Sequence, residues 1–295
     1  MSDTGGFPIL FLPQYAGKNN RVTGQSNAFG WENYVASSTS CAFGYRNTLF
    51  GNSSVAIGNG NNVGNTSSSN IYNTSSGAIG TNCNAYGVYG LAGGLSTSTG
   101  SQSSISFGAN LGSSGPNSAA FGSGGNLSSA RTFGFGANYR ATSIYGEFVH
   151  ASGGILSGGD SQRGWFLVGN QTTSAALTSL YTYPSISQVA VMPAGGRWGI
   201  SFDLIAATTG AINKSARFVR SFQIDRPTNA ASTVIVGSVQ TVGVDTGSNA
   251  GLPPSGWSVS ISADTTNGGP SFQVTGDTDT INWVASIQYV QIIRV

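Results

Sequence analysis

The segment AFGYRNTLFGNSSVAIG, residues 42–58, contains the unit that decides the fold. It begins with Ala42–Gly44 and ends with Ala56–Gly58, so a small residue, a large apolar residue and a glycine return after 14 positions. Between them, Leu49–Gly51 places the same unit at the half step of 7. Glycine costs about 1 kcal/mol relative to alanine inside a helix, so this spacing excludes a helical repeat. Each unit predicts a very short strand followed by a turn that needs glycine.

The same unit recurs through the first half of the chain. The interval is 22 between Ile57 and Ile79, where residues 65–70 are expected to form a bulged loop, and it falls to 12 between Phe121 and Phe133. Stacked coils of two short strands and two turns make a β-solenoid. A coil this small encloses little apolar surface, and small cores are marginal on their own. We therefore expect a homotrimer whose three-fold axis is lined by the large residues of the units, namely Phe29, Phe43, Phe50, Ile57, Ile79, Phe107, Phe121 and Phe133.

The composition excludes several classes of protein. Charged residues are 7% of the chain, against about 25% in ordinary globular domains, and residues 47–130 contain none. The aromatic content of 11% excludes a disordered chain, and the 44 glycines exclude a helical bundle. A net charge of +2 does not provide the strongly basic surface that nucleic-acid binding needs. The early apolar run at 7–12 is too short to span a bilayer, so no membrane insertion is predicted.

The units Ser54–Gly58 and Ser118–Gly122 resemble the S-x-A-I-G repeats of trimeric autotransporter adhesin heads. Repeats of this kind also occur in bacteriophage tail fibres. The resemblance covers about residues 25–146 and implies a left-handed trimeric β-roll. Phe or Tyr often stands where the adhesin repeat has Ile, and the intervals are irregular.

The second half has the pattern of an antiparallel sandwich. Apolar residues alternate within 198–204, 257–261 and 281–289, and shorter runs at 163–168, 177–183 and 188–192 also read as strands. About nine short strands separated by turn signals indicate an antiparallel β-sandwich with a jelly-roll-like arrangement.

We therefore predict an all-β chain of three parts. Residues 1–24 would be a virion-attachment segment, 25–149 a repetitive β-solenoid shaft and 150–295 a β-sandwich head. The segment 257–285 resembles C-terminal domains of phage tail-fibre and structural proteins.

Residues able to carry chemistry are sparse. Glycoside hydrolysis needs two carboxylates roughly 5–10 Å apart, and the repetitive half offers chiefly Glu32 and Glu147, which are remote in sequence. Asp264, Asp277 and Asp279 are interpreted as turn residues that accept Asx hydrogen bonds, with a weak calcium site as the alternative.

The remaining candidates for metal or redox chemistry are also interpreted as structural. His150, the single histidine, is expected to be a junction residue, with an axial metal site in a trimer as the alternative. Cys41 and Cys83 are expected to be buried free thiols. We predict no catalytic residue, no metal site and no cofactor, and we expect that the chain is not an enzyme.

Receptor recognition is expected in the second half. Trp198, Trp257 and Trp283 fall on apolar stripes and are predicted to be core. The loops 245–256 and 264–271 join strands, and recognition groups are commonly mounted on such loops. The predicted receptor-binding residues are Asp245, Asn249, Asp264, Thr266 and Asn267.

These features favour a structural fibre of a bacteriophage virion, with a tail fibre that binds the host surface at several weak sites at once as the expected role. Its predicted partners are two further copies of itself, other virion proteins through the N-terminus, and a host glycan or outer-membrane component. The alternatives are a head fibre or decoration protein on the capsid, a fragment of a bacterial trimeric adhesin, and a short polysaccharide depolymerase.

Overall fold

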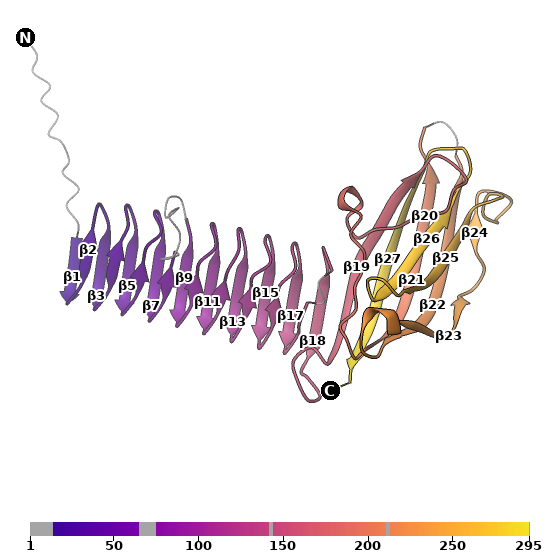
Figure 1. Cartoon of the computed structure of the whole chain (residues 1–295). Coiled ribbons are helices and arrows are strands. Elements are labelled where there is room, and N and C mark those ends of the chain that lie inside the picture. The colour runs from indigo at the N-terminus through magenta and orange to yellow at the C-terminus, as the bar shows by residue number, and fades with distance from the viewer. Residues whose placement is uncertain (1–13, 65–74, 142–143, 211–212, 295) are drawn as a thin grey trace, which may run out of the picture. The chain divides into compact units, whose positions relative to one another are not determined.

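A computed structural model describes residues 14–64, 75–141, 144–210 and 213–294 (Figure 1). These form two compact units that divide between Gly112 and Ser113. The apolar run at 7–13 and the expected loop at 65–70 lie outside the described residues. The described part of the predicted attachment segment already contains two strands, β1 and β2.

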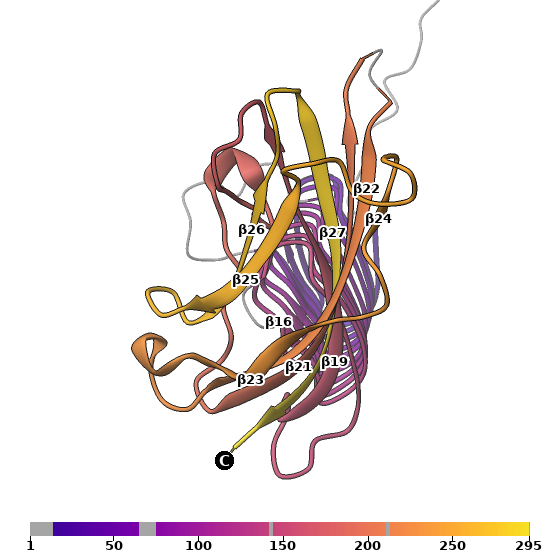
Figure 2. The ribbon, with the colours of Figure 1, turned by 90° about the vertical axis from the view of Figure 1, so that its right-hand side faces the viewer.

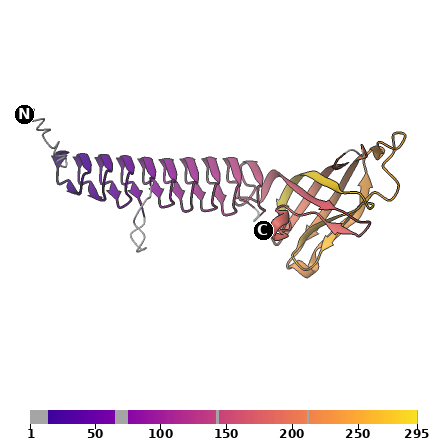
Figure 3. The same cartoon turned by 90° about the horizontal axis from the view of Figure 1, so that it is seen from above.

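Two parallel sheets make up the first unit. One contains β1 (Gln14–Lys18), β3 (Asn27–Trp31), β5 (Cys41–Tyr45), β7 (Val55–Asn59), β9 (Gly77–Thr81), β11 (Leu91–Leu95) and β13 (Ile105–Ala109), in that order. The other contains β2 (Arg21–Thr23), β4 (Tyr34–Ala36), β6 (Thr48–Leu49), β8 (Asn62–Val63), β10 (Asn84–Ala85) and β12 (Ser98–Thr99). Each coil therefore holds two short strands, as predicted, and Figure 3 shows the coils stacked side by side.

Strand register confirms both the step of 14 and the step of 22. Phe29 pairs with Phe43, Phe43 with Ile57, and Ile57 with Ile79. The chain thus returns to the same face after the interval of 22 that includes residues 65–74. We call the row Phe29, Phe43, Ile57 and Ile79 the apolar ladder.

The interior of the coils is narrower than the sequence pattern suggested. The small residue of each unit is fully buried, as with Ala42 and Ala56, and faces residues such as Leu49 from the second sheet. The large residue next to it points to the other side of the strand, so Phe43, Ile57 and Ile79 are 41, 42 and 44% exposed in the single chain. The row therefore lies outside the interior of the single coil, and its expected burial at a three-fold axis between copies stays a prediction. Phe50 follows β6 and packs on Tyr34, with ring centroids 5.7 Å apart, so it is not part of the ladder.

A buried asparagine ladder holds the coils in register. The Asn47 side-chain amide donates to the carbonyls of Phe43 and Gly58, at 3.1 and 3.0 Å. Its carbonyl oxygen accepts the backbone N–H of Asn61 at 3.2 Å, and Asn33 and Asn61 repeat the arrangement. Cys83 takes the next place, where its thiol donates to Gly94 O at 3.3 Å. Each side chain of this ladder therefore forms hydrogen bonds with backbone groups that a turn leaves unpaired.

Substitution of one asparagine of this ladder is expected to lower the stability of the coil region. Asn47→Ala leaves two carbonyls and one N–H without their partner in a buried site, and unsatisfied groups cost about 1–3 kcal/mol each. Allowing for water entry, we expect a loss of about 2–3 kcal/mol in the free energy of unfolding, measured by chemical denaturation. Asn59→Ala, at an exposed asparagine of the next coil, is the control and should leave stability unchanged; equal effects would show that the ladder is not a stabilising element.

The second unit begins with more coil strands. β15 (Ala119–Ser123), β17 (Phe133–Ala137) and β18 (Phe148–Ser152) are parallel, with β16 (Asn126–Leu127) in the other sheet; β14 (Gly112–Ser113) lies at the division of the units. Phe121 pairs with Phe135 and Gly122 with Gly136, so the predicted step of 12 to Phe133 is wrong. Residues 133–136 contain two overlapping Phe-Gly units, and the second keeps the period of 14.

Long antiparallel strands follow. The large sheet runs β18, β19 (Ser161–Thr172), β27 (Ile281–Ile293), β21 (Gly196–Thr208), β22 (Ser215–Arg226) and β23 (Val234–Thr241), with β24 (Thr246–Gly247) beside β22. The small sheet holds β20 (Thr178–Ser179), β26 (Gly269–Thr275) and β25 (Ser258–Asp264), and Figure 2 shows β25 and β26 on one side of β21 and β22. This confirms the β-sandwich, while a jelly-roll connectivity stays a prediction.

Aromatic rings fill the space between these sheets. Phe202 stacks on Phe272 with centroids 5.3 Å apart, and Trp198, Trp257 and Trp283 are buried as predicted. Residues 188–192 are not a strand: Ala190 and Met192 are buried, and Met192 N–H donates to Gly268 O, so the segment closes an edge of the core. The described helices are the short 3-10 turns η1 (Pro184–Ile186) and η2 (Ala230–Ser232). None of the described helices is long and apolar enough to cross a membrane.

Candidate binding face of the sandwich

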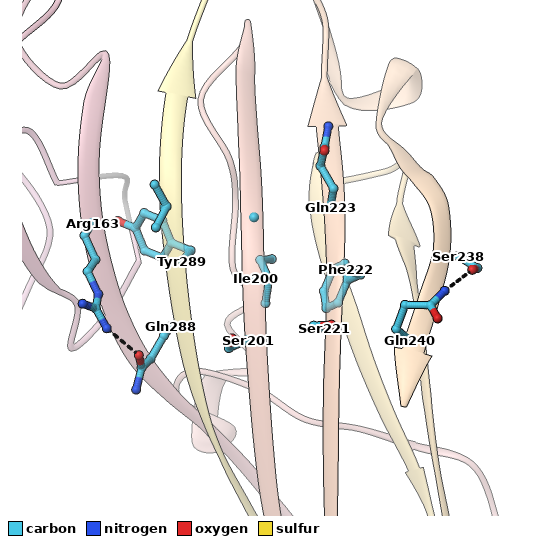
Figure 4. A pocket seen from close by; sticks show the side chains of 12 residues that line it. Arg163, Ile200, Ser201, Ser221, Phe222, Gln223, Ser238, Gln240, Gln288 and Tyr289 are labelled. Carbon is cyan, nitrogen blue, oxygen red and sulfur yellow. Dashed lines mark hydrogen bonds between the residues drawn. The ribbon is translucent and has the colours of Figure 1, made fainter. Parts of the chain in front are cut away.

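A hollow of about 450 Å³ lies on the face of the large sheet that points away from the sandwich core (Figure 4). Pockets of this size accommodate small ligands or part of a chain. Alternate residues of five neighbouring strands point to this face because side chains of a strand alternate between its two sides. The polar lining residues are Arg163, Ser201, Ser221, Gln223, Ser238, Gln240 and Gln288.

Strand register places four of these residues in one row across the sheet. Gln288 of β27 pairs with Ser201 of β21, Ser201 with Ser221 of β22, and Ser221 with Gln240 of β23. At the other end, Gln288 pairs with Trp165 of β19, which is 43% exposed. With strands about 4.8 Å apart, the line from Trp165 to Gln240 is roughly 19 Å long. We call Gln288, Ser201, Ser221 and Gln240 the polar row.

Gly199 opens the floor of the hollow beside this row. It pairs with Val290 on one side and Gln223 on the other, and a Cβ at this position would meet nothing within 4 Å. Arg163 donates to Gln288 Oε1 at 2.8 Å, and Gln240 donates to the Ser238 hydroxyl, as Figure 4 shows. No intramolecular side-chain hydrogen bond fixes the Ser201 or Ser221 hydroxyl in the part of the chain that the structure describes.

Two ion pairs bound the hollow along β21 and β22. Arg217 donates to both carboxylate oxygens of Asp203, at 2.9 and 2.7 Å, and Arg197 does the same for Asp225. These hydrogen bonds hold the pKa of Asp203 and of Asp225 below the usual range of a carboxyl. Both carboxylates are therefore ionised and occupied by their guanidinium partners at neutral pH. The middle of the hollow carries hydroxyl and amide groups between them.

An aromatic row continues the polar row in the opposite direction. Phe133 of β17 pairs with Phe148 of β18, and Phe148 with Trp165 of β19. The ring centroids lie 5.0 Å apart in the first pair and 5.3 Å apart in the second. His150, expected to be a junction residue, stacks on Phe135 at 4.3 Å. One line across the sheet therefore changes from aromatic to polar between β19 and β27.

The structure does not bring the predicted receptor residues together. Asp245 forms an ion pair with Arg220, and the backbone of Asn249 pairs with Leu252 in a tight turn. Asp264 accepts hydrogen bonds from the backbone N–H groups of Thr266 and Asn267. It is the last residue of β25, whereas Trp257 directly precedes the first. The loop 245–256 adjoins a separate hollow that includes Trp257, so the two loops lie at opposite ends of β25. Their receptor role stays a prediction.

The aspartates considered for calcium are engaged with the protein. Asp264 forms the predicted Asx turn, with Oδ1 to N distances of 3.0 and 2.9 Å. Lys214 donates to Asp277 and Asp279 at 2.9 and 2.6 Å. Within the described ranges, no group of three or more His, Cys, Asp or Glu side chains could hold a metal ion.

Sequence reasoning missed the polar row because its members are dispersed. Ser201, Ser221, Gln240 and Gln288 come from four strands, and only the pairing of those strands aligns them. The available signal was the polar alternate of each predicted strand, such as Gly199 and Ser201 between the buried Trp198, Ile200 and Phe202.

Comparisons with known proteins return phage tailspikes at low similarity. The Acinetobacter phage vB_ApiP_P1 tailspike is 11% identical with a TM-score of 0.20, and the match covers 91% of this chain and 72% of that protein. The Acinetobacter baumannii phage AM24 tailspike is 9% identical with a TM-score of 0.25, and this chain spans about half of it: 93% of this chain and 54% of that one. No protein-family model and no curated protein sequence matches the chain.

Proposed function

We propose that this chain is a structural fibre of a bacteriophage virion that attaches to the host cell surface by multivalent, non-covalent binding. The observation that carries the proposal is the apolar ladder, whose large side chains stand at a fixed spacing on the outside of coils that have almost no charge. Exposed apolar rows of this kind mark interaction surfaces. A row repeated along one face suits contact with identical copies, since closed symmetric assembly is the common state of oligomers.

Binding without cleavage fits the open face of the sandwich. Glycoside hydrolysis uses two carboxylates roughly 5–10 Å apart. On this face, Asp225 is bound to Arg197 of β21. Arg197 lies six residues from Asp203 on the same strand, which is roughly 20 Å at about 3.3 Å per residue. Each carboxylate is held by an arginine. These features support a binding role for this face.

The attachment role is tested with fluorescently labelled full-length protein and a panel of bacterial strains. Saturable binding to some strains, and competition with adsorption of a phage that grows on them, is the expected result. Gold-labelled antibody against the protein should mark phage particles in electron micrographs and would distinguish tail from capsid attachment. Absence of the protein from particles would contradict the proposed role in the virion.

The protein is expected to be a homotrimer in solution. Three copies could cover the ladders of one another, which removes apolar surface that a single chain leaves in water. Multi-angle light scattering of the native protein should give three times the monomer mass of 30.0 kDa. A mass equal to the monomer at micromolar concentration would contradict the trimer.

A further inference from the structure

We propose that the polar row and the hollow beside it bind an extended, hydroxyl-rich carbohydrate chain of the bacterial surface. This inference rests on the proposed attachment function and names its site and ligand class. It also moves the receptor site from the loops 245–256 and 264–271 to the open face of the large sheet. The reasons are the chemistry of the row, the opening at Gly199, and the boundary at Trp165.

The chemistry of the row matches a chain of hydroxyl groups. Serine hydroxyls and glutamine amides each donate and accept hydrogen bonds, as sugar hydroxyls do. Ser201 and Ser221 stand side by side at the middle of the row, with Gln288 and Gln240 at its ends. A ligand that lies across the strands can therefore meet a donor and an acceptor about every 4.8 Å.

The floor at Gly199 gives such a ligand room to approach the sheet. The register partners of Gly199 on the two adjacent strands, Val290 and Gln223, both carry side chains, so the missing Cβ creates a local depression. Arg163 adds a positive charge at this edge, and it belongs to none of the ion pairs found among the described residues. Carbohydrates that carry a carboxylate could pair with this guanidinium.

The boundary at Trp165 places an aromatic face at the end of the polar row. Its indole stacks on Phe148 on the side of the aromatic row, and Gln288 is its neighbour on the other side. An exposed indole offers an apolar face together with a polar N–H, which suits the C–H face of a sugar ring. Phe133 and Phe148 lie beyond it in the aromatic row, so Trp165 is the last aromatic side chain before the proposed ligand site.

Protein and nucleic acid fit this face less well. Exposed apolar side chains such as Val284, Val290 and Ile205 share this face, but serine, which protein interfaces are depleted in, occupies the middle of the polar row. Nucleic acid needs a track of free cations, and Arg197 and Arg217 are both bound to aspartates.

The test compares labelled variants of the full-length protein on a bacterial strain that binds the wild type. Gly199→Leu fills the depression from a position where a Cβ would meet nothing within 4 Å, and Trp165→Ala removes the indole. Ile205→Ser, on the same face but outside the hollow, and Asn267→Ala, in a predicted receptor loop, are the controls. We expect Gly199→Leu and Trp165→Ala to weaken binding at least tenfold and both controls to bind as wild type. Circular dichroism and light scattering should show unchanged fold and mass for Gly199→Leu.

Chemical treatment of the cells identifies the ligand class. Periodate, which cleaves the vicinal diols of sugars, should abolish binding, and proteinase K should leave it intact. The reverse result would show that the receptor is a protein. It would overturn the proposal of a carbohydrate ligand, while the attachment function would stand. Wild-type binding by Gly199→Leu, or loss of binding by Asn267→Ala alone, would remove the site from the hollow. A fall in mass for Gly199→Leu would assign the face to contact between copies, and binding to no strain would count against the attachment function itself.

Discussion

Replacement of Gly44 by alanine should unfold the coil region at moderate denaturant. Gly44 has φ of 118°, a conformation that residues with a Cβ rarely adopt. A Cβ there would lie 2.1 Å from the carbonyl oxygen of Gly58 in the next coil. That oxygen belongs to a backbone that is itself fixed by pairing, so the coils must separate. We expect a loss of at least about 4 kcal/mol in the free energy of unfolding, from strain and lost packing together.

The matched control for this prediction is Gly77→Ala. Gly77 lies in β9, and its neighbours in register are Val55 and Leu91, so the position accepts side chains in adjacent coils. A Cβ there would approach the end of the Leu91 side chain at 3.0 Å and the Val55 carbonyl oxygen at 4.0 Å. Thermal unfolding followed by circular dichroism should show a large fall in midpoint for Gly44→Ala and little change for Gly77→Ala. Similar midpoints for the two variants would mean that the coils adjust to a side chain at Gly44.

The repeat could be predicted from the sequence because each coil uses the same local chemistry. Glycine after a large apolar residue is visible at Gly44 and Gly58, and alternation within a strand of five residues fixes which side chains share a face. The sequence pattern did not show which face is the inside. Alanine is small enough for the narrow interior, so Ala42 faces in and Phe43 faces out. A general rule that places large apolar residues in the core gives the opposite answer.

The overlapping units at 133–136 show a second limit. Phe133-Gly134 and Phe135-Gly136 satisfy the same local pattern, and only pairing with Gly122 selects the second. The asparagine ladder was detectable in principle, since Asn33, Asn47 and Asn61 share the step of 14. Its role depends on hydrogen bonds between coils, which a single unit does not contain.

The candidate site was harder to predict than the fold. Alternation within 198–204 and 281–289 predicted the core of the sandwich, and the same alternation defines its open face. The residues that meet on that face are set by the order β19, β27, β21, β22 and β23. β27 lies between β19 and β21 although it is last in the chain, and no local signal reveals such an insertion.

Phe43→Asp should separate assembly from folding in this protein. In the single chain Phe43 lies on the outside of its coil, so a carboxylate there remains in water and the coil keeps its interior. Between copies, each carboxylate would replace an apolar contact and lie in a buried interface without a partner, which is strongly unfavourable. We expect the mass from light scattering to fall to that of a monomer while far-UV circular dichroism keeps its sheet signal; Phe121→Asp should behave alike. Ala42→Asp, one residue away but fully buried, should instead lose the sheet signal. An assembled Phe43→Asp variant with an unchanged melting temperature would show that the copies do not meet along the apolar ladder.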